Sequence, residues 1–211
     1  MDENIWTSLL SFGVGAYLLF LWSNDCRGKT AATDKAPTHL MPGSSLTSGK
    51  ALLLASLGAV AIVFTTTLVE VMTETFAEQS RIAPYFILAM FGAAIIEEIV
   101  FRGYFVIQKK GPTGIILSSL FFSLIFAVIH PYLWVMDSFE TYGLGAITTL
   151  RLEITTHGLL STISIFALSL WFYYCRFSRF NPSRSLLPCF FAHAFANLAV
   201  YIIKYSTGYI T

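Results

Sequence analysis

The ten residues Ile95-Ile96-Glu97-Glu98-Ile99-Val100-Phe101-Arg102-Gly103-Tyr104 place three charges inside an apolar segment. The segment runs from Pro84 to Ile107 and is long enough to cross a bilayer, since about 20 apolar residues span the hydrocarbon core. Each charge in such a run costs about 2.5–3.5 kcal/mol on the mildest insertion scale. Two carboxylates and a guanidinium therefore indicate a functional site, in which the charges compensate one another.

Helical geometry separates the three charges. Glu98 and Arg102 are four residues apart, so they share a face and can form an ion pair. Glu97 points about 140° away from Arg102 around a helix of 3.6 residues per turn. Two interpretations are open here. Either Arg102 neutralises Glu98 and leaves Glu97 for chemistry, or the segment holds an ion pair and a protonated carboxylic acid without chemistry.

The composition is that of a membrane protein. Of the 211 residues, 55% are hydrophobic and 12% are charged, whereas soluble domains carry about 25% charged residues. The net charge of +1 gives no basic patch for nucleic acid, so no nucleic-acid partner is expected. The three cysteines, Cys26, Cys175 and Cys189, lack zinc-site spacing, and we expect them to be small apolar fillers.

Long apolar runs predict an all-α membrane protein, a polytopic bundle of about six transmembrane helices with an intramembrane polar cavity. The first run is interpreted as a retained span, because no basic region or cleavage site accompanies it. The polar residues 24–50 are interpreted as a flexible linker that contains an isolated histidine, His39. The expected spans are Asn4–Trp22, Ala51–Val69, Pro84–Ile107, Thr113–Val135, Gly158–Cys175 and Leu186–Tyr205.

Lysine and arginine are unevenly distributed among the loops. The first, third and fifth loops hold nine of them, whereas the other two loops hold Arg81 and Arg151, and Lys204 lies at the C-terminal end of the sixth span. The positive-inside rule then places the odd-numbered loops in the cytoplasm. Both termini are predicted on the non-cytoplasmic side of the cell membrane.

Two polar patterns lie outside the spans. Glu70, Glu74 and Glu78 recur every four residues and predict an acidic, solvated face on a short surface helix. Glu153 and His157 are four residues apart at the head of the fifth span. We favour an interface pair over a metal-binding pair for these two residues.

Polar side chains recur on two further spans. His130 precedes Pro131, which cannot donate a backbone hydrogen bond and so predicts a kink around His130. His193 and Asn197 are four residues apart and share one face of the sixth span. A carboxylate and a histidine can hold and deprotonate a water, while a second histidine and an amide can stabilise an oxyanion. This set suits hydrolysis of an amide bond inside the membrane.

The three motifs, in this order on separate spans, resemble those of the CAAX protease and bacteriocin-processing (CPBP, ABI) family. These intramembrane endopeptidases include the prenyl-protein endopeptidase. The resemblance covers roughly residues 84–200 and implies a catalytic core at 84–205, after an N-terminal part, 1–83, with two spans. The matching residues are Glu97-Glu98-Ile99-Val100-Phe101-Arg102, Phe126-Ala127-Val128-Ile129-His130 and His193-Ala194-Phe195-Ala196-Asn197.

The resemblance implies a catalytic role for four residues. Glu97 would be the general base that activates water, and His130 would help to orient that water. His193 and Asn197 would stabilise the tetrahedral intermediate.

Glu98 and Arg102 would be the supporting pair that fixes the site. No cofactor is favoured, although Glu97, His130 and His193 offer the nitrogen and oxygen ligands that zinc accepts. Because the sequence has no His-Glu-x-x-His helix, we favour a glutamate-based mechanism without metal.

We therefore expect an intramembrane endopeptidase that cleaves a membrane-associated peptide or protein, near its C-terminus or in a membrane-proximal segment. One alternative is a non-catalytic membrane scaffold or immunity protein that keeps the same buried polar cluster. Another is a zinc-dependent version of the same protease. A proton- or ion-coupled carrier is disfavoured, because the sequence shows no inverted repeat.

Overall fold

The computed structural model describes residues 4–31, 41–135 and 149–211. Within these ranges, five helices are long and apolar enough to cross a membrane. The protein is therefore a multi-pass membrane protein with an all-α bundle, as the sequence predicts. The five helices are α1 (Ile5–Ala31), α2 (Gly49–Met72), α4 (Gly111–Ile129), α6 (Thr156–Phe177) and α7 (Leu187–Ser206).

The segment predicted as the third span is divided into two kinds of helix. The α-helix α3 (Phe86–Glu97) continues directly into a π-helix, η2 (Glu98–Tyr104). In a π-helix each N–H bonds to the carbonyl five residues earlier, and the amide of Phe105 donates to the carbonyl of Val100 at 3.0 Å. The two adjacent glutamates of the motif therefore lie on either side of the junction.

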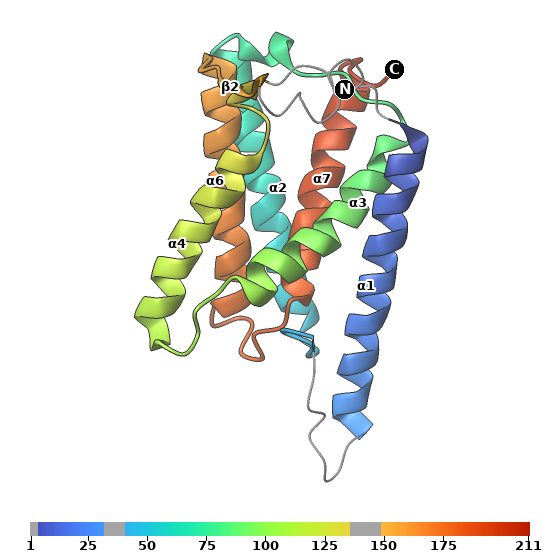
Figure 1. Cartoon of the computed structure of the whole chain (residues 1–211), viewed down its shortest axis with the longest axis vertical. Helices are drawn as coiled ribbons and strands as arrows, with labels where there is room; N and C mark the ends of the chain where they lie inside the picture. The colour runs from blue at the N-terminus through green and yellow to red at the C-terminus, as the bar shows by residue number, and fades with distance from the viewer. Residues whose placement is uncertain (1–3, 32–40, 136–148) are drawn as a thin grey trace.

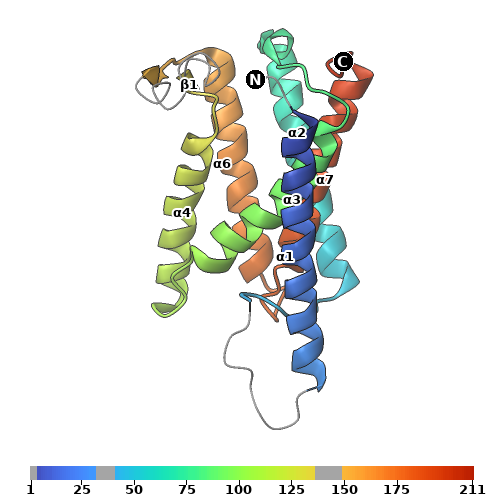
Figure 2. The ribbon, with the colours of Figure 1, turned by 45° about the vertical axis from the view of Figure 1, so that its right-hand side comes forward.

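Helix α3 crosses the bundle obliquely in front of α7, and α1 packs along α3 (Figure 1). The backbones of α1 and α3 touch at a glycine, because a Cβ on Gly92 would lie 2.2 Å from the carbonyl oxygen of Ser11. Helix α2 packs against both α6 and α7, and α4 packs against α6 on the far side of the bundle (Figure 2).

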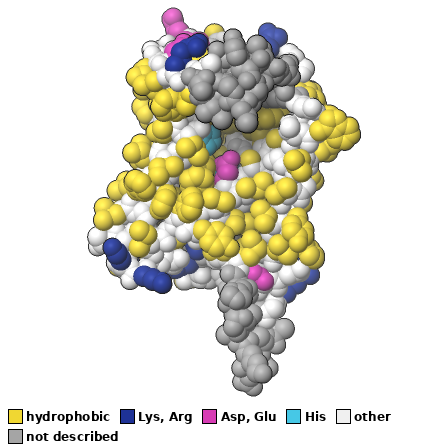
Figure 3. Space-filling model, in the orientation of Figure 1, with side chains coloured by type: hydrophobic (Ala, Val, Ile, Leu, Met, Phe, Trp, Pro, Cys, Tyr) yellow, Lys and Arg dark blue, Asp and Glu magenta, His cyan; other side chains and the backbone are white. Residues whose placement is uncertain are grey.

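The start of α1 and the end of α7 lie at the same end of the bundle (Figure 1). The helix ends that flank the odd-numbered loops lie at the opposite end of the bundle: the end of α1 and the starts of α2, α4 and α7. Figure 3 shows apolar side chains over the middle of one face, with Lys and Arg side chains toward its two ends. This distribution suits a bundle whose middle contacts lipid.

A two-stranded antiparallel sheet lies over one end of α4 and α6. It consists of β1 (Trp134–Val135) and β2 (Arg151–Leu152), with Trp134 opposite Leu152. The indole N–H of Trp134 donates to the carbonyl of Val128 at 2.8 Å. This bond ties the sheet to the last turn of α4.

The predicted kink at His130 is wrong, because α4 ends at Ile129 instead. His130 has an extended backbone, with φ −69° and ψ 138°. A following proline disfavours the α conformation of the residue before it, and Pro131 therefore ends the helix.

The predicted solvated face at Glu70 is also wrong. Helix α2 continues through Glu70, and the side chain is buried. Its Oε2 accepts a hydrogen bond from Gln79 Nε2 at 2.6 Å. A short 3-10 helix, η1 (Thr75–Glu78), follows α2.

Helix α1 runs past its predicted end at Trp22 to Ala31, so the first part of the predicted linker is helical. His39 and the rest of residues 32–40 lie outside the described residues. The prediction for the three cysteines is confirmed, since Cys26, Cys175 and Cys189 are all buried.

Replacing Gly92 by valine is expected to push α1 away from α3 and to lower the free energy of unfolding by about 1–3 kcal/mol, as overpacking does. Gly13→Val is the matched control in α1, because nothing lies within 4 Å of a Cβ at that position. Thermal unfolding of the two variants in detergent measures the difference. Equal melting temperatures would contradict the close contact at Gly92.

Candidate active site

The polar centre of the bundle is an ion pair on the π-helix. Nη1 of Arg102 lies 3.1 Å from Oε1 of Glu98, and both side chains are fully buried. The wider turn of a π-helix brings residues four apart closer to alignment along the axis. The pair that the four-residue spacing predicts is thus present, and each charge compensates the other in an apolar interior.

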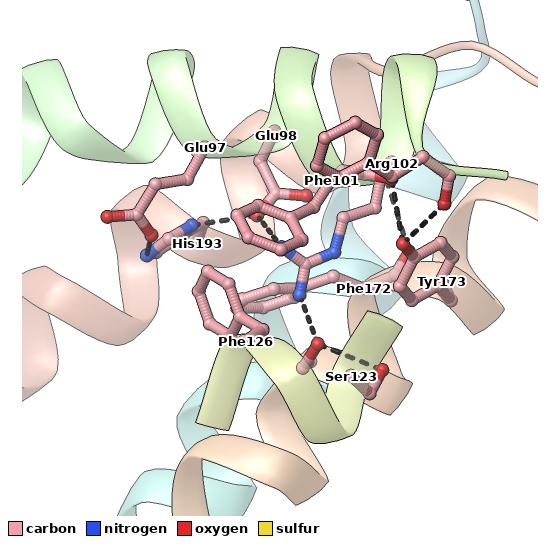
Figure 4. A network of polar contacts seen from close by, with 12 residues as sticks. Glu97, Glu98, Phe101, Arg102, Ser123, Phe126, Phe172, Tyr173 and His193 are labelled. Atoms are coloured by element: carbon pink, nitrogen blue, oxygen red, sulfur yellow. Dashed lines mark hydrogen bonds and ion pairs between the residues drawn. The ribbon is translucent and has the colours of Figure 1, made fainter. Parts of the chain in front are cut away.

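Hydroxyls and aromatic rings enclose the guanidinium of Arg102 (Figure 4). Its Nη2 donates to Oγ of Ser169 at 2.7 Å, and that hydroxyl donates to Oγ of Ser123 at 2.9 Å. Aromatic faces near a guanidinium add cation–π attraction, which strengthens where water is excluded. Three rings have their centres 4.6–5.1 Å from Cζ of Arg102: Phe126, Phe172 and Tyr173.

Helix α6 also binds the backbone of the π-helix. The hydroxyl of Tyr173 lies 2.7 Å from the carbonyl oxygen of Phe101 and 2.9 Å from that of Phe105. Nη1 of Arg176 donates to the carbonyl of Gly103 at 3.2 Å. Buried carbonyl groups need such partners, so α6 stabilises the π geometry from outside.

His193 on α7 contacts both glutamates (Figure 4). Its Nδ1 lies 2.8 Å from Oε1 of Glu98, and its Nε2 lies 3.8 Å from Oε2 of Glu97. Its ring stacks on Phe172, with the ring centres 4.9 Å apart. Because the carboxylate of Glu98 only accepts hydrogen bonds, we assign the ring proton to Nδ1 and leave Nε2 facing Glu97.

Glu97 differs from Glu98 in its exposure. Its side chain is 28% exposed, whereas that of Glu98 is completely buried. In Figure 3 an acidic side chain and a histidine lie near one another amid apolar side chains. Of the two carboxylates, only that of Glu97 is therefore open to a substrate or to solvent.

His130 reaches the site through an aromatic neighbour. Its Nδ1 donates to the carbonyl of Phe126 at 2.6 Å, and its ring centre lies 4.7 Å from that of Phe126. The same phenyl ring meets His193 edge-on, with centres 6.5 Å apart. No hydrogen bond or ion pair joins His130 to Glu97 within the described part of the chain.

Asn197 joins α7 to α3. Its Nδ2 donates to the carbonyl of Met90 at 2.8 Å. Met90 lies two turns before Glu97, and Asn197 lies one turn after His193, so the two helices run antiparallel and meet at both levels. The oxyanion role of Asn197 stays a prediction, because this amide contacts helix backbone in the structure.

Comparison with known protein families assigns the chain to one of them. A family model described as type II CAAX prenyl endopeptidase Rce1-like matches residues 79–199. The chain belongs to this family. The matched range includes every predicted site residue and covers more than half of the chain. No curated protein and no solved structure gives a significant match.

Membership of the Rce1-like family indicates a CAAX-type intramembrane endopeptidase in general terms, with a peptide or protein substrate in the membrane. The recognition from three motifs is thereby confirmed. The geometry adds a feature that the motifs did not indicate, since Glu98 contacts both Arg102 and His193.

In this Rce1-like chain, the two histidines of the zinc set that the sequence suggested each use Nδ1 for another partner, which leaves Nε2 as the nitrogen that could bind a metal. His193 gives its Nδ1 to Glu98, and His130 gives its Nδ1 to a backbone carbonyl. Across residues 4–31, 41–135 and 149–211, no three His, Cys, Asp or Glu side chains converge as ligands of a metal ion. A mechanism without metal stays a prediction.

The sequence reasoning missed the residues that hold Arg102 and His193 in place. Ser123 and Ser169 had a signal, since a buried hydroxyl in an apolar span needs a polar partner. Phe172 and Tyr173 had none, because aromatic residues are ordinary in a membrane helix.

Arg102→Met is expected to lower the free energy of unfolding by about 3–5 kcal/mol, because it leaves the buried carboxylate of Glu98 without its cation. The double variant Glu98→Gln/Arg102→Met should recover much of this loss, since it removes both charges. Unfolding of the two variants in mixed SDS and non-ionic micelles measures the difference. A double variant no more stable than Arg102→Met would contradict the ion pair.

Proposed function

We propose that this protein cleaves a peptide bond of a membrane-associated peptide or protein, using a water that Glu97 activates beside His193. The observation that supports this most strongly is the distance of 3.8 Å between Oε2 of Glu97 and Nε2 of His193. That distance is too long for a direct hydrogen bond. It allows one water to lie within hydrogen-bond distance of both atoms.

In the proposed reaction, Glu97 acts as the general base. Its carboxylate takes one proton from the water while the water oxygen attacks the carbonyl carbon of the scissile bond. The tetrahedral intermediate collapses as the C–N bond breaks, and the leaving amine receives that proton. A positioned general base contributes about 10²–10⁴-fold to the rate.

Glu98 and Arg102 support the histidine in this proposal. Glu98 accepts the Nδ1 proton of His193, which directs Nε2 toward the water. A carboxylate that orients a histidine in this way also stabilises the imidazole ring when the ring becomes protonated. Nε2 receives from Glu97 the proton taken from the water, uses it to donate a hydrogen bond to the oxyanion, and then passes it to the leaving amine.

His130 and Asn197 act at the edges of the site. His130 contacts Phe126, the ring that lies against His193, and we propose that it orients the water or the substrate from that side. Asn197 holds α7 against α3 through Met90. We propose that this bond maintains the spacing between His193 and Glu97.

We further propose that residues 84–205 form the catalytic core without a cofactor. The family match over residues 79–199 supports this range. Helices α1 and α2 pack on the core elements, which supports one membrane domain rather than two. The excess of Lys and Arg in the odd-numbered loops supports a cell-membrane orientation with both termini outside the cytoplasm.

Glu97→Gln is expected to reduce cleavage by at least about 10²-fold, because the amide cannot act as the base but keeps the shape of the side chain. The assay uses the purified protein in liposomes with a library of membrane-anchored peptides, and mass spectrometry identifies the products. Glu74→Gln, at an exposed glutamate, is the matched control and should cleave like the wild type.

Full cleavage by Glu97→Gln would rule out the proposed base. Function that survives both Glu97→Gln and His193→Ala would instead support a non-catalytic scaffold. A chelator in the same assay tests the zinc-dependent alternative, and we expect unchanged cleavage.

Asn197→Ala is expected to lower the free energy of unfolding by about 0.5–1.5 kcal/mol, because one partly buried hydrogen bond is lost. Cleavage should remain measurable, with the same products. Melting temperature, kcat and KM are measured together. A fall in kcat of about 10²–10³-fold at an unchanged melting temperature would assign Asn197 to the oxyanion instead.

A further inference from the structure

A second polar region lies between α2, α6 and α7, toward the end of the bundle that carries the termini. It is a cavity of about 150 Å³, which corresponds to about five water molecules at about 30 Å³ each. Its wall begins near the helix ends at Glu70, His157 and Lys204 and descends to Leu168 and Val200. None of the site residues described above lines it.

Hydroxyl and charged side chains from all three helices line this cavity. Glu70 and Lys204 are each only 9% exposed. Nζ of Lys204 donates to the carbonyl of Ser80 at 2.5 Å. Charged residues within membrane helices typically face partners or water-filled cavities. The polar side chains that α2, α6 and α7 contribute are Thr66, Thr67, Glu70, His157, Ser161, Ser164 and Lys204.

His157 belongs to this wall. The expected interface pair with Glu153 has no hydrogen bond within the described residues, and the ring of His157 instead meets Tyr132 edge-on at 6.4 Å. Its Nδ1 is buried and has no hydrogen-bond partner among the described residues. Buried polar atoms are normally satisfied by protein or by water, so this atom favours a hydrated cavity.

Along α6, the floor of the cavity adjoins a residue of the buried polar centre. Leu168 directly precedes Ser169, the residue that accepts a hydrogen bond from Arg102. One turn further along α6, Phe172 stacks on His193. The hydroxyls of the cavity and the site histidine are therefore separated by little more than a layer of apolar side chains on α6.

We propose that this cavity is filled with water and supplies the water that hydrolysis consumes. Each cleaved peptide bond uses one water, whereas apolar side chains cover most of the middle of the face shown in Figure 3. Leu168 acts as the gate, and water passes when its side chain changes rotamer. The supply role rests on the proposed protease function, but the hydration of the cavity does not.

Hydration is tested by cysteine labelling in liposomes with a charged, water-soluble methanethiosulfonate reagent. Ser164 on the cavity wall and Ile163 beside it are compared as Ser164→Cys and Ile163→Cys. Ile163 is 61% exposed, so surface exposure alone predicts that its cysteine reacts faster. A hydrated cavity predicts the opposite order, by at least about tenfold, because only a thiol in contact with water forms the reactive thiolate.

The wild-type protein gives the background, since its three cysteines are buried. Labelling of Ser164→Cys no faster than Ile163→Cys would overturn the hydrated cavity. Thr66→Cys on α2 serves as a second probe against Phe64→Cys, which is also exposed on the outer surface. Thr66→Cys is likewise expected to be labelled faster than Phe64→Cys.

The supply role is tested on the labelled Ser164→Cys protein. Its kcat should fall by about tenfold at an unchanged KM, because the attached group blocks the cavity and not the substrate site. Removal of the group with dithiothreitol should restore the rate. Unchanged cleavage after complete labelling would overturn the supply role. If Ser164→Cys is labelled but no cleavage depends on Glu97, the hydrated cavity is supported and the proposed protease function is rejected.

Discussion

A guanidinium in the middle of an apolar bundle imposes the arrangement of its neighbours. Arg102 requires an anion, hydroxyls and aromatic rings around it, and no single helix supplies all three. Glu98 provides the charge from the π-helix, Ser169 provides the hydroxyl from α6, and the ring of Phe126 comes from α4. The cost of burying this charge thus brings distant parts of the sequence to one point.

The two adjacent glutamates differ in exposure, and the helix changes its winding between them. Glu98 opens the π-helix and is fully buried, whereas Glu97 closes the α-helix and stays partly exposed. One carboxylate compensates the cation and orients His193. The other keeps a face open to reactants. Proteins commonly place π turns at functional sites, and here the turn begins between a partly exposed and a fully buried carboxylate.

The type of fold followed from composition alone. Long apolar runs have few alternatives to membrane helices, because backbone polar groups cannot stay unpaired in lipid. Helix ends were less predictable. Pro131 ends α4 where a kink was expected, and Glu70 is buried where a surface helix was expected, since the surrounding helices decide both outcomes.

The candidate residues of the site could be named from the sequence, but their geometry could not. The four-residue spacing predicts the ion pair of Glu98 and Arg102, because residues four apart lie on the same face of a helix. The rotation of α3 against α7 and the π turn decide which glutamate contacts His193. Residue spacing predicts neither of these two features. The supporting role of Phe172 depends on how α6 packs on α7, which residue spacing does not encode.

The π-helix also makes chain length part of the chemistry. A π turn accommodates one residue more than an α-helical path through the same space. Loss of a single codon between positions 98 and 104 would restore ordinary winding without disturbing the membrane crossing. A loss between Glu98 and Arg102 would also shorten their spacing from four residues to three, which changes the geometry of their buried ion pair. Among similar sequences, a gap of one residue between these two positions would thus indicate a different winding around the ion pair, even where every charged residue is kept.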